Sequence, residues 1–135
     1  MIKRAFALWL TALMVSAVLL FVPPGVRAAI RETRAAHWDC RSWGWNLYGQ
    51  LGDGTNTDRK TPVGVPGLTG VVSVAAGYGH SLALLSDGTV RAWGWNLYGQ
   101  LGDGTNTDRK KPVKVSGLSG VVAIAAGSSH SLTLK

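Results

Sequence analysis

One segment of this chain, running from Trp43 to Lys60, is repeated without a single change from Trp93 to Lys110. The two copies begin fifty residues apart. Repeats of this length are typical of solenoids and propellers, in which each small unit buries its apolar face against the next unit. The chain is therefore expected to consist of copies of one supersecondary unit that pack side by side.

The similarity extends beyond the identical segment, since residues 41–85 match residues 91–135 at all but eleven of forty-five positions. Each period alternates apolar runs with turns, and Ser86-Asp87-Gly88-Thr89 has the composition of a tight hairpin. The pattern predicts short strands at residues 71–76, 80–84, 89–95 and 112–115. Four short antiparallel strands in about fifty residues are typical of a propeller blade. A right-handed solenoid is the competing fold, but its strands would be parallel.

The composition of each strand predicts its place in the blade. The run at residues 71–76 is small and β-branched, so we expect a strand that is buried on both faces. Leu82 and Leu84 alternate with Ser81 and Ala83, which predicts one face for each pair. A proline at position 112 suits an edge strand, because proline has no N–H to donate.

Residues 1–28 have the three-part layout of a signal peptide, with a basic start, an apolar run and a small-residue site before Ile30. Residues 29–40 lack a clear period and are expected to form a tether, followed by two propeller repeats over residues 41–135. The expected location is therefore secreted or in the cell envelope. The net charge is +7, but Lys3, Arg4 and Arg27 fall within the signal. An uncleaved signal would be just long enough to cross a membrane.

A single cysteine, Cys40, cannot form an internal disulfide. It is either a free thiol or one half of an intermolecular pair.

The two copies together contain the motifs G-x-x-H-S-L, D-G-T-V, A-W-G-x-N and G-Q-L-G-D-G, the last followed by a Pro-Val strand. In these motifs the chain resembles the repeats of the regulator of chromosome condensation family. The resemblance implies an all-β, seven-bladed propeller, of which residues 41–135 supply only about two blades. Residues 43–65 would give the last two strands of one blade, and residues 121–134 the first two strands of another. We therefore interpret the chain as a fragment of a larger propeller, or as a protomer that completes its half-blades with other copies.

Few side chains suit catalysis. The resemblance assigns His80 and His130 to holding a turn, and neither a metal site nor a cofactor is predicted. The oxygen-rich run from Asp53 to Asp58 lacks the spacing and terminal glutamate of an EF-hand and is interpreted as a turn-forming loop. The only glutamate is Glu32, in the tether, and every aspartate of the repeats lies beside glycine or in a polar loop, so the two opposed carboxylates of a glycosidase are not predicted. A non-enzymatic binding module is the favoured interpretation.

Recognition is expected on the long repeated loop, whose aromatic side chains Trp45, Tyr48, Trp95 and Tyr98 resemble those of binding surfaces. The residues predicted to contact a ligand are Asn56, Thr57, Asp58, Arg59, Asn106, Thr107, Asp108 and Arg109. The expected partner is a protein or an anionic envelope polymer and not nucleic acid, with self-association through open sheet edges as a further expectation. Two alternatives are a secreted propeller similar to β-lactamase inhibitors and an enzyme whose active residues lie in blades absent from this sequence.

Overall fold

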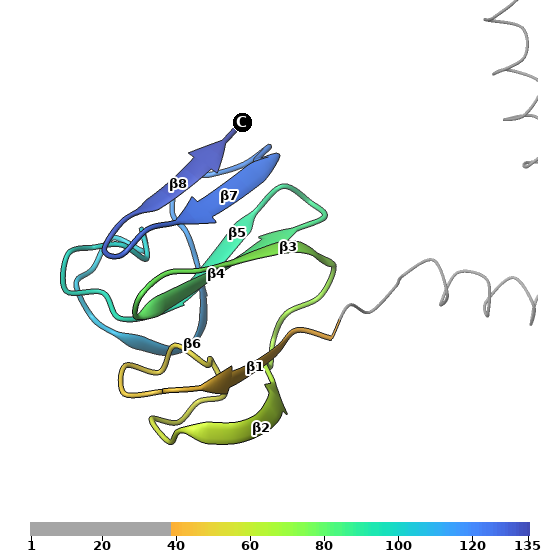
Figure 1. The fold of residues 1–135 in the computed structure, drawn as a ribbon. Helices are drawn as coiled ribbons and strands as arrows, with labels where there is room; N and C mark the ends of the chain where they lie inside the picture. Colours follow the sequence, from red (N-terminus) through yellow and green to blue (C-terminus); the bar gives the residue numbers. More distant parts are fainter. Residues whose placement is uncertain (1–38) are drawn as a thin grey trace, which may run out of the picture. The chain divides into compact units, whose positions relative to one another are not determined.

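The computed structural model describes residues 39–135. The predicted signal peptide, and the predicted tether up to residue 38, lie outside this range. Within it, no helix is both long and apolar enough to cross a membrane. The described residues form strands joined by turns and long loops (Figure 1).

The strands form three antiparallel sheets, with a four-stranded sheet between two pairs of strands (Figure 1). The first pair is β1 (Arg41–Gly44) with β2 (Arg59–Gly64), which we call the N-terminal half-blade. The complete blade has the order β3 (Val71–Ala76), β4 (His80–Leu85), β5 (Val90–Gly94) and β6 (Arg109–Lys114). The second pair, β7 (Ala123–Ala126) with β8 (Ser131–Leu134), is the C-terminal half-blade.

The hairpin between β4 and β5 forms at the predicted Asp-Gly turn. The Asp87 carboxylate accepts hydrogen bonds from the N–H of Thr89 at 2.9 Å and from its hydroxyl at 2.7 Å. Gly88 has a φ of +76°, which a side chain would strain. The turn sets a register in which Leu84 faces Val90 and Leu82 faces Ala92. The all-β fold with four antiparallel strands per blade is therefore as predicted.

The core lies where each sheet packs on the next. On one face of the complete blade, Ala83 and Trp93 pack with Val65, which follows β2. On the other face, Leu82 and Leu84 pack towards Ile124 of β7. The predicted alternation of β4 is thus confirmed, because its leucines and its alanine contribute to opposite faces of one sheet.

Two of the predicted strand properties are wrong. The strand at residues 71–76 is not buried on both faces, since only Val71 is fully buried and Val72 and Val74 are exposed. The physical reason is that only one face of β3 is covered: Ala75 packs towards Ile124 of β7, whereas among the described residues no sheet packs on the face that carries Val74. The strand expected at residues 112–115 begins earlier, at Arg109, and Pro112 lies inside it. It is nevertheless an edge strand, where proline is tolerated.

Candidate binding surface

Each copy of the long loop is organised around one buried asparagine, Asn46 in the first copy and Asn96 in the second. The side-chain oxygen of Asn96 accepts a hydrogen bond from the N–H of Leu101 at 3.0 Å, and its amide nitrogen donates to the carbonyl oxygens of Thr105 and Thr107 at 3.0 Å each. Asn46 makes the equivalent contacts in its own loop. Because one buried amide bonds three separate points of the backbone, it fixes the shape of the loop.

An ion pair closes each loop. Arg109 donates to the carboxylate of Asp103 at 2.7 Å, and the Asp103 side chain is only 6% exposed. Burial alone raises the pKa of Asp103, but hydrogen bonds from Thr105 and Arg109, together with the charge of Arg109, outweigh it and lower the pKa to about 2. The pKa of Asp53, which is paired with Arg59 in the first loop, is lowered by the same balance of causes.

The residues predicted to contact a ligand lie in two equivalent sets, one in each loop, and most of their polar groups serve the loop itself. The amide of Asn56 donates to the carbonyl oxygen of Leu47 at 2.7 Å, and the carboxylate of Asp58 accepts from the N–H of Asn46 at 2.8 Å. Arg59 is held in its ion pair. The second loop repeats these contacts with Asn106, Asp108 and Arg109.

Thr57 and Thr107 differ from the other predicted contact residues. Their carbonyl oxygens accept from the buried asparagines, but within residues 39–135 their exposed hydroxyls form no hydrogen bond. A ligand-binding role for the eight residues therefore stays a prediction, and these two exposed hydroxyls are available to serve it.

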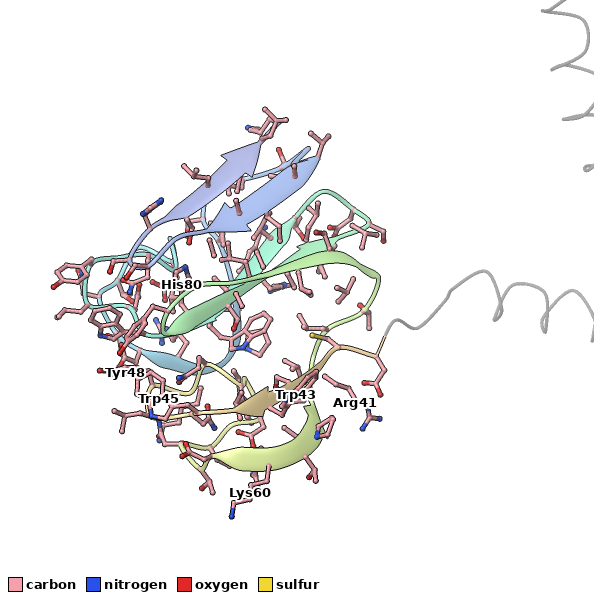
Figure 2. All side chains as sticks on the ribbon, in the orientation of Figure 1. Arg41, Trp43, Trp45, Tyr48, Lys60 and His80 are labelled. Atoms are coloured by element: carbon pink, nitrogen blue, oxygen red, sulfur yellow. The ribbon has the colours of Figure 1, made fainter. Side chains whose placement is uncertain are left out.

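A continuous row of five aromatic rings crosses the two loops and the turn before β4. Successive ring centroids are 5.8, 5.4, 5.4 and 5.3 Å apart, and we call this surface the aromatic row. In order, its members are Tyr78, Trp45, Tyr48, Trp95 and Tyr98. Figure 2 shows Trp45 and Tyr48 side by side at one end of the sheets. The contact between Tyr48 and Trp95 is a stack that joins one copy of the loop to the other.

The row rests on a close approach of backbone and ring. A Cβ atom added at Gly79 would lie 3.1 Å from Cβ of Trp95 and 3.2 Å from Cδ2 of Tyr48, so a glycine lets these rings approach. The end members, Tyr78 and Tyr98, are 64% and 67% exposed. The surface is thus aromatic, solvent-facing and built on a tightly packed base.

Sequence reasoning found four of the five rings but did not connect Tyr78 to them. Tyr78 precedes a different strand and reaches Trp45 only in the folded chain. A signal was present, however, because Tyr78 and Gly79 are among the few positions at which the copies differ, and the second copy has Ser128 and Ser129 there.

His80 links the complete blade to the C-terminal half-blade. Its Nε2 lies 3.0 Å from the hydroxyl of Ser131, which donates to the carbonyl oxygen of Gln100 at 2.8 Å. Burial and the charge of His130 lower the pKa of His80, so the ring is neutral near pH 7. Among the residues that the structure describes, no three His, Cys, Asp or Glu side chains are grouped as metal ligands.

Comparison with known families assigns the repeats. The family "Regulator of chromosome condensation (RCC1) repeat" matches residues 42–84 and 87–134, and a second description of the same repeat matches residues 71–100. The chain belongs to this family. Among curated relatives, the secretion-regulating guanine nucleotide exchange factor of Bos taurus is 53% identical over 47 residues, and the ultraviolet-B receptor UVR8 of Arabidopsis thaliana is 48% identical over 44 residues. These matches cover 33% and 31% of this chain and 10% of each relative.

Solved structures support the same assignment. Human WBSCR16 is 31% identical with a TM-score of 0.60, over 69% of this chain and 25% of that one. Prp20p from Saccharomyces cerevisiae is similar in fold, with a TM-score of 0.64 at 18% identity, over 73% of this chain and 27% of that one. The chain thus spans about a quarter of the length of these structures and about a tenth of the curated relatives.

The expected location outside the cell or in its envelope is wrong. The relatives are nuclear or intracellular members of the family, among them Prp20p, which is described with its binding to Gsp1p and histones and in a complex with Kap60. The expectation of an anionic envelope polymer as partner depended on that location and loses its support with it. The signal-like pattern of residues 1–28 misled the interpretation, because a basic start and an apolar run do not by themselves determine where a chain is found.

Proposed function

We propose that the chain is a non-enzymatic protein-binding module and that the aromatic row recognises a segment of another protein. The observation that carries the proposal is the row itself, five touching rings of which the end members are largely exposed. Tyrosine and tryptophan are enriched at protein interfaces because they combine a large apolar surface with a hydrogen-bonding group. Leu47 and Leu97, both exposed in the same loops, add apolar surface.

The loops that carry the row are held in place before any partner binds. Asn46 and Asn96 fix the loop backbones, and the ion pairs of Asp53 and Asp103 close them. A rigid surface loses little conformational entropy on binding, so more of its contact energy appears as affinity. We propose that Thr57 and Thr107 supply polar contacts beside the rings.

The carboxylates of the repeats fit a structural role better than a catalytic one. Asp53, Asp87 and Asp103 each accept hydrogen bonds from a threonine two residues later, and the pKa of each is lowered. A general acid or base works best when its pKa is near the working pH, and these groups are moved away from neutrality.

The relatives bind proteins, which agrees with the proposal. Prp20p is described as binding Gsp1p and histones, and it is found in a complex with Kap60. The nucleotide exchange in the name of the bovine relative is not part of the proposal, because the match covers 10% of that protein.

A display library of random peptides, selected on the immobilised full chain, tests this function. Peptides that bind the wild-type chain should lose affinity by about tenfold or more when Tyr98 is replaced, as in Tyr98→Ser, because exposed aromatic residues of this kind often dominate binding energy. Asp87→Ser, in the hairpin between β4 and β5, is the control and should bind normally. Peptides that bind wild type and Tyr98→Ser equally well would contradict the proposal.

A further inference from the structure

Two tryptophans at equivalent positions of the repeat have opposite surroundings. Trp93 is 2% exposed, its indole N–H donates to the carbonyl oxygen of Gln50 at 2.8 Å, and it packs against Val65 and Ala83. Trp43 is 62% exposed. The difference arises because Trp93 packs on the preceding copy of the repeat, and the described residues contain no such copy for Trp43.

A cleft of about 340 Å³ reproduces the surroundings of Trp93 one repeat later, and we call it the Trp socket. Its lining includes Gln100, Gly102, Val115, Leu118 and Thr133. These residues lie fifty positions after the neighbours of Trp93, which are Gln50, Gly52, Val65, Leu68 and Ala83. The carbonyl oxygen of Gln50 accepts from both Ser81 and Trp93, whereas Gln100 accepts only from Ser131 within the described part of the chain. The socket therefore offers the acceptor that the indole N–H of Trp93 uses, and four of these five lining residues are identical to the neighbours of Trp93, with Thr133 in place of Ala83.

The leucines of β8 show the same contrast. Leu132 and Leu134 are 60% and 63% exposed, although Leu82 and Leu84, fifty residues earlier, are 1% and 4% exposed. In β4 these side chains pack against Ala92 and Val90 of β5 and against Ile124 of the next sheet. Among residues 39–135, β8 has neither a strand paired along its outer edge nor a sheet packed on the face that carries its leucines.

The hydrogen-bonding groups of the two open edges are complementary. The N–H of Gly127 donates to the carbonyl oxygen of His130. In an antiparallel pair, the backbone groups of successive residues point alternately towards the partner strand and away from it. Those of Leu132 therefore point towards β7, and those of Ser131 and Thr133 point outwards. Just before β1, the carbonyl oxygen of Cys40 accepts a hydrogen bond from the N–H of Val65, which follows β2. By the same rule, the backbone groups of residues 41 and 43 point away from β2. In the complete blade, the equivalent positions of β4 and β5 are paired, with Ser81 opposite Trp93.

We propose that the C-terminal half-blade of one copy of this chain pairs with the N-terminal half-blade of a second copy, which completes a four-stranded blade and places Trp43 of the second copy in the Trp socket. The register follows from the complete blade, where Ser81 faces Trp93 and Leu84 faces Val90. In the assembly, Ser131 faces Trp43 and Leu134 faces Cys40. The occupant is a second copy because the contact repeats an interface that the chain already forms between its own copies of the repeat.

The contact joins two different surfaces of the same molecule, so it is heterologous. Each added copy leaves one open half-blade of each kind at the ends of the assembly. Such contacts produce a closed ring if the rotation closes and a filament if it does not. A closed ring covers every open strand edge, whereas a filament leaves one edge of each kind uncovered at its ends.

Cysteine cross-linking of the full chain tests the register. The wild-type chain, which has Cys40, is mixed with a C40S/L134C chain and treated with a mild oxidant. Because residues at a non-hydrogen-bonded pair have Cα atoms about 4.5 Å apart, within the disulfide range, a covalent heterodimer is expected on a non-reducing gel. Burial and the charge of Asp39 raise the pKa of the Cys40 thiol, so cross-linking should be faster at higher pH.

A matched chain, C40S/T133C, carries its thiol one residue away, on the opposite face of β8, and should cross-link with wild-type chain far more slowly. Equal cross-linking of the two chains, or none with C40S/L134C, would overturn the proposed register.

Light scattering tests the assembly itself. The wild-type chain should have a mass of two or more copies that falls on dilution. Thr133→Pro removes an outward N–H of β8 and should lower the mass to one copy, whereas Thr133→Val keeps that N–H and should still assemble. A wild-type chain that remains a monomer at high concentration, or an unchanged mass for Thr133→Pro, would overturn the proposal.

Discussion

Asp53 and Asp103 each accept hydrogen bonds from a threonine and form an ion pair with an arginine of the same loop. This combination favours the charged carboxylate in the folded chain more than in the unfolded chain. Sequence reasoning placed Arg59 and Arg109 on the ligand side of the loop and missed their partners. The partners were missed because an aspartate and an arginine six residues apart in a loop follow neither the helix nor the strand period from which a contact could be predicted.

The lowered pKa of Asp103 predicts how stability depends on pH. The pKa is about 2 in the folded chain and 3.8 for an ordinary aspartate, so the stabilisation is complete above about pH 4 and is lost as the pH falls towards 2. Urea unfolding at a series of pH values should show the free energy of unfolding decreasing over this interval. Asp103→Asn should be less stable at pH 7 and should show a smaller decrease. An equal decrease in both proteins would show that Asp103 is not responsible.

At the scale of the element, much of the fold could be predicted because its signals are local. The fifty-residue period, the Asp-Gly hairpin and the alternation of Leu82 and Leu84 are all properties of short segments. The exposure of Val74 and Trp43 could not be predicted in this way. Whether an apolar side chain is buried depends on the presence of a neighbouring blade, and the repeat alone does not contain that information.

Gly44 and Gly94 allow the effect of a neighbouring blade to be measured. Both have a positive φ, 107° and 102°, so alanine should cost about 1 kcal/mol of backbone strain at either position. At Gly94 the added Cβ would also lie 2.8 Å from Cα of His80 and 3.1 Å from Cα of Gln50, while nothing lies within 4 Å of it at Gly44. Gly94→Ala should therefore lose about 2 kcal/mol or more beyond Gly44→Ala in urea unfolding of dilute, monomeric chain. Similar losses for the two variants would show that the strands adjust to the added methyl group.

For the whole molecule, the proposed assembly and the aromatic row are connected. Tyr48 stacks on Trp95, one copy of the repeat further on. If the half-blades of two chains join in the register of the complete blade, Tyr98 of one chain lies beside Trp45 of the next, with Ser129 in the place that Gly79 takes between Tyr48 and Trp95. The row then continues from one chain to another, and a repetitive partner could bind several copies at once with greater avidity.

Variants of Trp43 and Trp93 allow the stability of the fold and the stability of the assembly to be measured separately. The two rings belong to the same repeated motif, but that of Trp43 is exposed and that of Trp93 lies in the core. Trp93→Ala removes a buried ring and its hydrogen bond and should cost about 3–5 kcal/mol of unfolding free energy. Trp43→Ala should cost less than about 1 kcal/mol in the dilute monomer, because the ring is exposed there, yet it should abolish assembly by leaving the Trp socket empty. Urea unfolding and light scattering on both variants check this. Trp43→Phe, which restores the ring without the N–H, should recover part of the assembly, and full assembly of Trp43→Ala would show that the socket is not the point of contact.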